Sequence, residues 1–227
     1  MHGRIIAIDG PSASGKSSTG AEVARRLGFL HVDSGALYRA IAVVATEMKE
    51  DWTTVGPACL LREAERRGLR FQPVDGWLVP FLDGKPAESL LRTPRVTEVV
   101  SPVSAVPEVR EWVNTRLRAL AAEGQSIVMD GRDIGSVVFP DAQLKIFLTA
   151  TPESRARRRL EQRGERVDEQ AVVEEAARLA ARDRADSQRA VAPLVQAPDA
   201  VVVDTTNLTF DQQVERIVAL ARERLGR

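Results

Sequence analysis

The residues from 10 to 18 read Gly10-Pro11-Ser12-Ala13-Ser14-Gly15-Lys16-Ser17-Ser18, and this stretch decides the fold. Its first eight residues match the pattern G-x-x-x-x-G-K-[ST]. They follow a short apolar run at residues 5–8 and open a segment with helical spacing, the setting in which the pattern has structural meaning. The alternative is a chance turn rich in glycine and serine, which would need four fixed residue types and this setting to coincide. We therefore predict a strand, a phosphate-binding loop and a helix, in that order.

The loop also predicts a ligand. Its backbone N–H groups can surround phosphate oxygens at the positive end of the following helix, and Lys16 can place its charge between the β- and γ-phosphates. The Ser17 hydroxyl is suited to hold Mg²⁺. We expect residues 10–18 to bind ATP, with Mg²⁺ as the cofactor. The loop alone does not separate a switch, a motor and a small-molecule kinase, but the guanine-reading N-K-x-D and the D-x-x-G of a GTPase are both absent from the sequence.

Composition limits the remaining classes of function. The chain has 227 residues, of which 44% are hydrophobic, so one domain can bury a full core. Its 32 basic and 32 acidic residues cancel, which argues against a nucleic acid or a membrane surface as the partner. Cys59 is the only cysteine, and no apolar run approaches the length of a membrane span. We expect a cytoplasmic monomer with small-molecule substrates.

Five short apolar segments predict the strands of a parallel sheet, because each is followed by turn residues and then by a helical pattern. They are residues 5–8, 29–32, 127–129, 145–148 and 201–203. Alternation of strands and helices is typical of an α/β fold with a parallel sheet flanked by helices. Helix boundaries are predicted at Gly28, at Thr151-Pro152 and at a capping box formed by Thr209 and Gln212.

The pattern changes at about residues 69–91. Two Asp-Gly pairs, at 75–76 and 83–84, separate short apolar runs there, which predicts a small antiparallel insert. Pro73 and Pro80 cannot donate to a ladder, so its strands should be short and lie at sheet edges. Prolines at positions 94, 102 and 107 are expected to punctuate the return to helix.

Polar residues follow the second and third predicted strands, at the carboxyl edge where α/β sheets bind ligands. Ser34, Tyr38 and Arg39 supply a hydroxyl, a ring and a planar fork, which suit an anionic acceptor; an ordinary helix cap with Tyr38 in the core is the alternative. After the third strand, Asp130 can hold Mg²⁺ and Arg132 can reach a transferring phosphate.

Arg182, Asp186 and Arg189 are spaced to share one face of a helix at about residues 168–190. An acid between two guanidinium groups could grip a sugar or base together with a phosphate. The alternative is a solvated face laced with salt bridges. The stretch from 155 to 189 is rich in arginine around Gly164, and we interpret residues 155–166 as a lid that closes over the phosphates and excludes water.

These strings, taken in order, resemble those of the bacterial cytidylate kinase family. The resemblance is carried by residues 8–18, 33–39, 130–135, 137–142, 145–148 and 182–194, so it covers essentially the whole chain. It implies an adenylate-kinase-like sheet of five parallel strands, an arginine-rich lid and a long acceptor-binding insert, and it implies CMP and dCMP as acceptors. The acceptor contacts that it implies are Ser34, Tyr38, Arg39, Ser101, Arg110, Arg132, Asp133, Arg182, Asp186 and Arg189. Pro102, beside Ser101, departs from the family pattern, whereas Ser17 and Ser18 replace a common Gly-Thr and keep the metal-binding hydroxyl.

The predicted organisation and mechanism follow from this. The chain is expected to be one kinase domain with a core at 1–68, 92–150 and 191–227, an insert at about 69–91, and a lid with acceptor-contacting helices at about 151–190. We expect Arg39, Arg132 and Arg189 to hold the acceptor phosphate and Ser101, Arg110, Asp133 and Asp186 to select the base. Catalysis is assigned to Lys16, Arg132, Arg158 and Arg182, and Mg²⁺ to Ser17 and Asp130. A kinase for UMP or for a non-nucleotide metabolite, or an ATP-gated binding protein, are the alternative interpretations.

Overall fold

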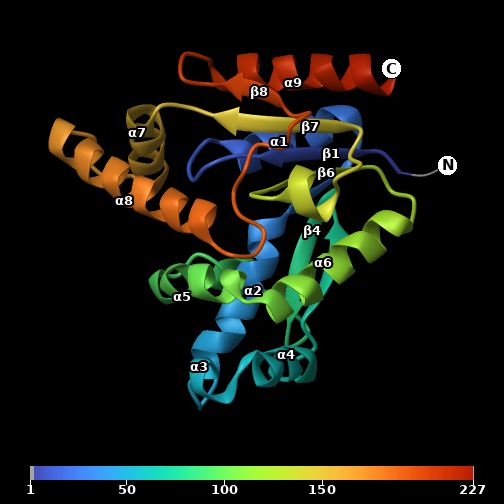
Figure 1. Ribbon diagram of the computed structural model, residues 1–227, viewed down its shortest axis with the longest axis vertical. Coiled ribbons are helices and arrows are strands. Elements are labelled where there is room, and N and C mark those ends of the chain that lie inside the picture. The colour runs from blue at the N-terminus through green and yellow to red at the C-terminus, as the bar shows by residue number, and fades with distance from the viewer. Residues whose placement is uncertain (1–2, 227) are drawn as a thin grey trace.

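The computed structural model describes residues 3–226, and its centre is a mostly parallel sheet with strand order β3-β4-β2-β6-β1-β7-β8 (Figure 1). Five neighbouring strands of this sheet pair in parallel. They are β1 (Ile5–Asp9), β2 (Leu30–Asp33), β6 (Ile127–Gly131), β7 (Leu144–Thr149) and β8 (Val201–Asp204). All five strands expected from the sequence are therefore present, and the predicted α/β fold is confirmed.

Helices cover both faces of the sheet. They are α1 (Lys16–Leu27), α2 (Ser34–Glu47), α3 (Trp52–Val55), α4 (Pro57–Arg66), α5 (Pro94–Ala105), α6 (Pro107–Ala122), α7 (Pro152–Arg163), α8 (Glu169–Gln188) and α9 (Phe210–Leu225), with short turns η1 (Glu88–Leu90) and η2 (Ile134–Val138). Alternate residues of β1 enter different cores, as the period of a strand requires. Ile6 and Ile8 pack with α1 and α9, whereas Ala7 faces the core built on α2, α5 and α6.

The local signals for helix ends are confirmed. Thr151 caps α7 and is followed by Pro152 in the first turn, while Gly28 takes a left-handed conformation after α1. Thr209 and Gln212 form both hydrogen bonds of a capping box at the start of α9. These ends depend on neighbours within a few residues, which is why the sequence reveals them.

The insert is antiparallel as predicted, with β3 (Arg70–Val74), β4 (Trp77–Leu82) and β5 (Lys85–Pro86) joined at the two Asp-Gly turns. It is not a separate excursion, however. The backbone N–H of His31 donates to the Gly76 carbonyl at 2.8 Å, and β4 pairs in parallel with β2 at Trp77. The insert therefore extends the central sheet, which has more strands than the five expected.

Two predicted boundaries are corrected by packing. Pro94 and Pro107 begin α5 and α6, but Pro102 lies inside α5 instead of ending it. Buried Val96, Val100 and Val103 hold α5 against the core, and this packing outweighs the backbone hydrogen bond that the proline removes. Similarly, α8 ends at Gln188, so Arg189 stands at the helix cap and not within the helix.

Helices α7 and α8 stand beyond the carboxyl ends of the strands, to the left of the sheet in Figure 1. They share a small core of their own, made by Ala156, Leu160, Val172 and Leu179, against which Ala13 of the phosphate loop packs. This pair of helices therefore makes apolar contact with the loop at Ala13. No helix among residues 3–226 is long and apolar enough to cross a membrane.

Candidate active site

The loop at residues 10–18 joins β1 to α1 and depends on its glycines for shape. A Cβ on Gly10 would lie 2.1 Å from the carbonyl oxygen of Leu148, so no other residue fits there. Gly15 has a φ of 88° at the start of α1, a conformation that favours glycine. The Lys16 Nζ atom bends back and donates to the Pro11 carbonyl at 2.8 Å. The loop thus forms a closed turn with an ammonium group inside it.

Lys16 is buried and forms no ion pair with a carboxylate among residues 3–226. Burial and the positive charge of Arg132 lower its pKa to about 7, although Asp130 and Asp33 act in the opposite direction. A group in this state gains stability when a negative charge arrives, because the anion restores the charged form of the lysine. The electrostatics of the loop therefore favour a phosphate ligand.

Ser17 and Asp130 meet beside Lys16. The Ser17 hydroxyl donates to Asp130 Oδ2 at 2.6 Å, and Asp130 Oδ1 lies 2.9 Å from His31 Nε2. A hydroxyl next to a carboxylate is a set of hard oxygen atoms of the kind that Mg²⁺ prefers, and Mg²⁺ is usually held by one or two such groups together with substrate phosphates. Among residues 3–226, no cluster of three or more His, Cys, Asp or Glu side chains could hold a metal by itself. The pair fits a metal ion that arrives with a nucleotide.

Asp9 fixes the loop that carries Arg132 and Asp133. Its two carboxylate oxygens accept from the backbone N–H groups of Ile134 and Gly135 at 2.8 and 2.7 Å. Burial raises the pKa of Asp9 to about 6 in spite of these bonds. An acid at the end of an otherwise apolar strand, as in Ile5–Asp9, was the available signal for this residue, and our sequence analysis assigned it no role.

A cavity of about 340 Å³ opens between the phosphate loop, α2, α5, α6 and α8. All ten residues expected to contact the acceptor line it, together with Ser12, Ala13, Lys16 and Ser17 of the loop and with Asp130. Nine arginines and Lys16 face five carboxylates around the cavity, so its lining is strongly positive although the whole chain is neutral. The fold thus brings together side chains from five separate parts of the sequence.

One end of the cavity is built on a buried ion-pair network. Asp133 pairs with Arg110 through one oxygen, and its other oxygen accepts from Arg189 at 3.2 Å. Arg110 and Asp133 are buried, and the Arg110 guanidinium lies 5.3 Å from the centre of the Tyr38 ring. Tyr38 is itself buried, which raises the pKa of its hydroxyl to about 12. Planar donors and acceptors held this rigidly can read the edge of a small ring.

A second pair ties α8 to the phosphate loop. Arg132 donates to Asp186 at 2.8 Å and to the Ser12 hydroxyl at 2.9 Å. Asp183 accepts from the Ser12 N–H at 2.8 Å and pairs with Arg155 at 2.5 Å. The face of α8 predicted from spacing is therefore turned into the site and is not a solvated face.

Other arginines in the cavity have no carboxylate partner among residues 3–226. Arg39 donates only to the Leu91 carbonyl and to Thr97, at 3.2 and 3.4 Å, and the buried Nε atom of Arg182 has no hydrogen bond. Burial lowers the pKa of Arg39 to about 10, with a further contribution from the positive charge of Arg182. Burial and the charge of Arg132 likewise lower the pKa of Arg182. Guanidinium groups that repel one another in this way form a site for an anion.

Arg158, one of the residues to which catalysis was assigned, does not line this cavity. Its guanidinium donates to the side chain and the carbonyl of Thr205, at 2.9 and 2.5 Å. It lines a second, open cavity of about 800 Å³ with Phe210, Gln213 and residues 15–18. The neighbouring Arg159 lines the first cavity instead. Successive residues of a helix point in different directions, so a run of arginines does not say which one faces the site.

Several residues that line the first cavity had no individual role in the sequence analysis. They are Asp33, Arg92, Arg159, Arg163, Glu175 and Arg178. Asp33 ends a strand as Asp9 does, and its side chain accepts from the Ala36 N–H at the start of α2. Arg92 carries no local motif, and only the fold reveals its position.

Comparisons with known proteins agree on one family. A family model described as cytidylate kinase matches residues 6–223. A cytidylate kinase of Pelotomaculum thermopropionicum is 43% identical over 217 residues, covering 94% of each chain. A cytidylate kinase of Geobacillus kaustophilus is also 43% identical over 224 residues, covering 97% of each chain.

A solved structure supports the fold. The crystal structure of TT1252 from Thermus thermophilus aligns with 99% of this chain and 99% of its own, with a TM-score of 0.50 and 23% sequence identity. At this identity the likeness concerns the fold alone.

Proposed function

Since the chain belongs to the cytidylate kinase family, we propose that it transfers the γ-phosphate of ATP to CMP or dCMP, giving ADP and CDP or dCDP. It is accordingly a phosphotransferase. One observation supports this function at the level of individual residues. The positively charged cavity beside Lys16 is lined by every residue expected to contact the acceptor, and it adjoins a second cavity along the same loop.

The acceptor phosphate would be held by the arginines that have no carboxylate partner. Arg39 and Arg182 meet this condition, and Arg132 adds a third charge from the loop after β6. Arg189, which the sequence analysis assigned to the phosphate, is paired with Asp133 and fits better beside the base. A phosphate that bridges Arg39 and Arg182 would relieve their mutual repulsion.

The cytosine ring would lie against Ser101, Arg110 and Asp133, where donors and acceptors are fixed by the buried ion pair. Asp186 would then face the sugar, next to Arg132. A site built around specific hydrogen bonds can reject a mismatched base by up to ~10⁴-fold, because mismatched polar groups stay buried and unpaired. Purines should also be too large for this end of the cavity.

ATP would lie along residues 10–18, with its nucleoside end in the second cavity. Arg158 and Phe210 line that cavity, so Arg158 would contact the nucleoside of ATP and not the transferring phosphate. Ser17 and Asp130 would hold Mg²⁺ with the nucleotide, and the ion would supply positive charge to the β- and γ-phosphates.

The acceptor phosphate needs no general base, since it is already an anion at neutral pH. One of its oxygens forms a bond to the γ-phosphorus while the bond to the β–γ bridging oxygen breaks, and the electron pair stays on ADP. Lys16 and the arginines of the site neutralise the charge of the moving group, and their fixed positions supply most of the rate. A monomeric state and a cytoplasmic location stay predictions.

A coupled assay of ADP release tests this function. ATP and Mg²⁺ are supplied with CMP, dCMP, UMP, AMP or GMP, and a mixture without acceptor reports hydrolysis. Turnover mainly on the cytidine nucleotides is expected. Activity only on AMP or GMP, or none above the hydrolysis rate, would reject the assignment. Equal activity on UMP would leave the reaction standing and contradict the proposed reading of the base by Asp133.

A further inference from the structure

The two cavities of the site are not separate, because they share part of their lining. The shared residues are Ala13, Lys16, Ser17, Asp33, Arg92 and Arg159. The first cavity contains the acceptor residues and the second adjoins residues 15–18 of the phosphate loop. If ATP and the acceptor occupy them as described above, the γ-phosphoryl group crosses from one to the other at these six residues. We call this shared region the junction.

Two arginines reach the junction from two separate elements. Arg159 comes from α7, and Arg92 comes from the segment between η1 and α5. The arginines expected to hold the acceptor, namely Arg39, Arg132 and Arg182, line the first cavity only. Arg92 and Arg159 can therefore contact the phosphoryl group as it moves between the cavities, whereas Arg39, Arg132 and Arg182 can contact the acceptor in the first cavity.

The backbone around Arg92 is firmly held. Leu91 is buried and its carbonyl accepts from Arg39 at 3.2 Å, while Thr93 caps α5 and Pro94 begins it. The Arg92 side chain is exposed, and among residues 3–226 it has no hydrogen bond or ion pair. The unpaired side chain of Arg92 therefore extends from a segment of backbone that is held in place.

The surroundings of Arg92 are already positive. Its charge contributes to lowering the pKa of Arg39 and of Arg159, in both cases after the larger effect of burial. Asp33 also feels the charge of Arg92, yet burial and Asp130 raise its pKa in spite of it. Arg92 and Arg159 at the junction and Arg39 in the first cavity oppose one another, an arrangement that is favourable only when an anion is present.

The geometry points to Arg92 as a catalytic residue that binds the γ-phosphoryl group during transfer. This inference rests on the function proposed above. In the step, an acceptor oxygen bonds to the γ-phosphorus, the bond to the bridging oxygen of ADP breaks, and no proton is gained or lost. Arg92, from the segment before α5, and Arg159, from α7, contact the equatorial oxygens of the moving group, and Lys16 contacts it from the loop. Their contribution is greatest in the transition state, when the group is bound fully to neither nucleotide.

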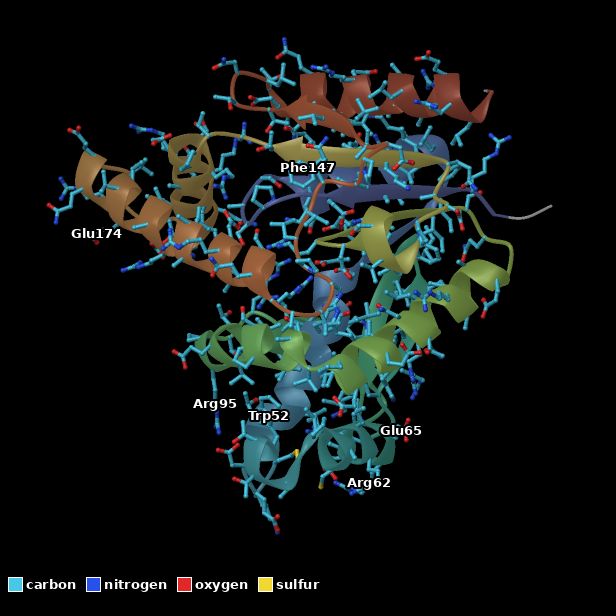
Figure 2. The ribbon with its side chains drawn as sticks, in the orientation of Figure 1. Trp52, Arg62, Glu65, Arg95, Phe147 and Glu174 are labelled. Carbon is cyan, nitrogen blue, oxygen red and sulfur yellow. The ribbon has the colours of Figure 1, made fainter. Side chains whose placement is uncertain are left out.

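The test compares Arg92→Ala with Arg95→Ala as a matched control. Arg95 lies three residues after Arg92, in the first turn of α5, and it is exposed and lines neither cavity; Figure 2 shows its side chain projecting away from α8. For Arg92→Ala we expect kcat to fall by ~10²-fold with the dissociation constant of CMP within a few-fold of wild type. Arg95→Ala should match wild type in both. Arg92→Lys should recover part of kcat, since it restores the charge but not the planar fork.

A second measurement does not depend on turnover. ADP, Mg²⁺ and aluminium fluoride with CMP imitate the group in transfer, and Arg92→Ala should weaken assembly of this complex by a similar factor to the loss of kcat. An unchanged kcat would overturn the inference. So would a CMP dissociation constant that rises as much as kcat/KM falls, because Arg92 would then bind the acceptor alone. If the wild-type enzyme fails to use cytidine nucleotides, the proposed function fails first; if it uses them and Arg92→Ala behaves like wild type, only this inference fails.

Discussion

Two groups of arginines in the same cavity differ in what balances their charge. Arg110 and Arg189 share the buried carboxylate of Asp133, and Arg132 pairs with Asp186. Arg39 and Arg182 have no ion pair among residues 3–226, and burial lowers the pKa of each. We call these the paired and the unpaired group.

The difference indicates two kinds of recognition. The paired group is held in place by the protein, so it can present a fixed pattern of donors and acceptors before any ligand arrives. The arginines of the unpaired group repel one another until an anion binds between them, so their favourable electrostatic energy appears only when the ligand is bound. Replacing a member of the paired group should therefore lower the stability of the fold. Replacing a member of the unpaired group should weaken substrate binding and leave the stability of the free protein unchanged or higher.

The largest effect is expected at Lys16, a buried cation with no ion pair among residues 3–226. Lys16→Met keeps an unbranched side chain one atom shorter and removes its charge, so we expect kcat to fall by ~10³-fold because Lys16 no longer neutralises the charge of the moving phosphoryl group. Thermal unfolding of the unliganded variant should occur at the same or a higher temperature. Loss of stability together with activity would show that Lys16 stabilises the fold as the paired group does, and would contradict the distinction.

Breaking the paired group comes next. Asp133→Ala leaves Arg110 and Arg189 buried without a counter-charge, and we expect the free energy of unfolding to fall by about 3–5 kcal/mol. Denaturant unfolding with circular dichroism measures this loss. Asp83→Asn is the control, because Asp83 pairs with Arg67 at an exposed site, where a salt bridge contributes at most about 1 kcal/mol. Equal losses in the two variants would show that the buried network does not stabilise the fold.

Removing a member of the unpaired group should have the opposite effect on stability. For Arg39→Met we expect CMP to bind ~10²-fold more weakly, since a charge-assisted contact to phosphate is lost. The unfolding temperature of the free protein should stay the same or rise, because repulsion with Arg182 is relieved. Calorimetric titration with CMP and thermal scans with and without CMP measure both quantities. A variant that is less stable yet binds CMP normally would reverse our assignment of the two groups.

The smallest effect concerns the protonation of Lys16. In the free protein its pKa is about 7, and nearby phosphates would raise it, so ATP binding should take up a proton at pH 7 to 8. The affinity for ATP should then fall as the pH rises above 7, by at most about tenfold per pH unit. Titration calorimetry in buffers of different ionisation enthalpy measures the proton uptake. Lys16→Met should show less uptake than wild type, and equal uptake in both would exclude Lys16 as its source.

The sequence revealed most of the fold because its signals are local. The strand at residues 5–8, the loop that follows it and the capping box of α9 each depend on neighbours a few residues away. The union of the insert with the main sheet was not predictable in this way, since it depends on contacts of His31 with the distant Gly76 and Trp77. Pro102 also carries a reliable local preference, which the burial of α5 overrides.

Taken alone, the sequence determined the class of fold, the phosphate loop and the set of polar residues from which the site is built, because these follow from short patterns and from a resemblance along the whole chain. Only the tertiary structure decided how the charges are distributed among them. The partners Arg132 and Asp186 are 54 residues apart, and Arg189 and Asp133 are 56 apart. Which arginine is neutralised, and which is left for a phosphate, is fixed by contacts between distant segments. The adjacent Arg158 and Arg159 face different cavities for the same reason, since the direction of each depends on how α7 is docked.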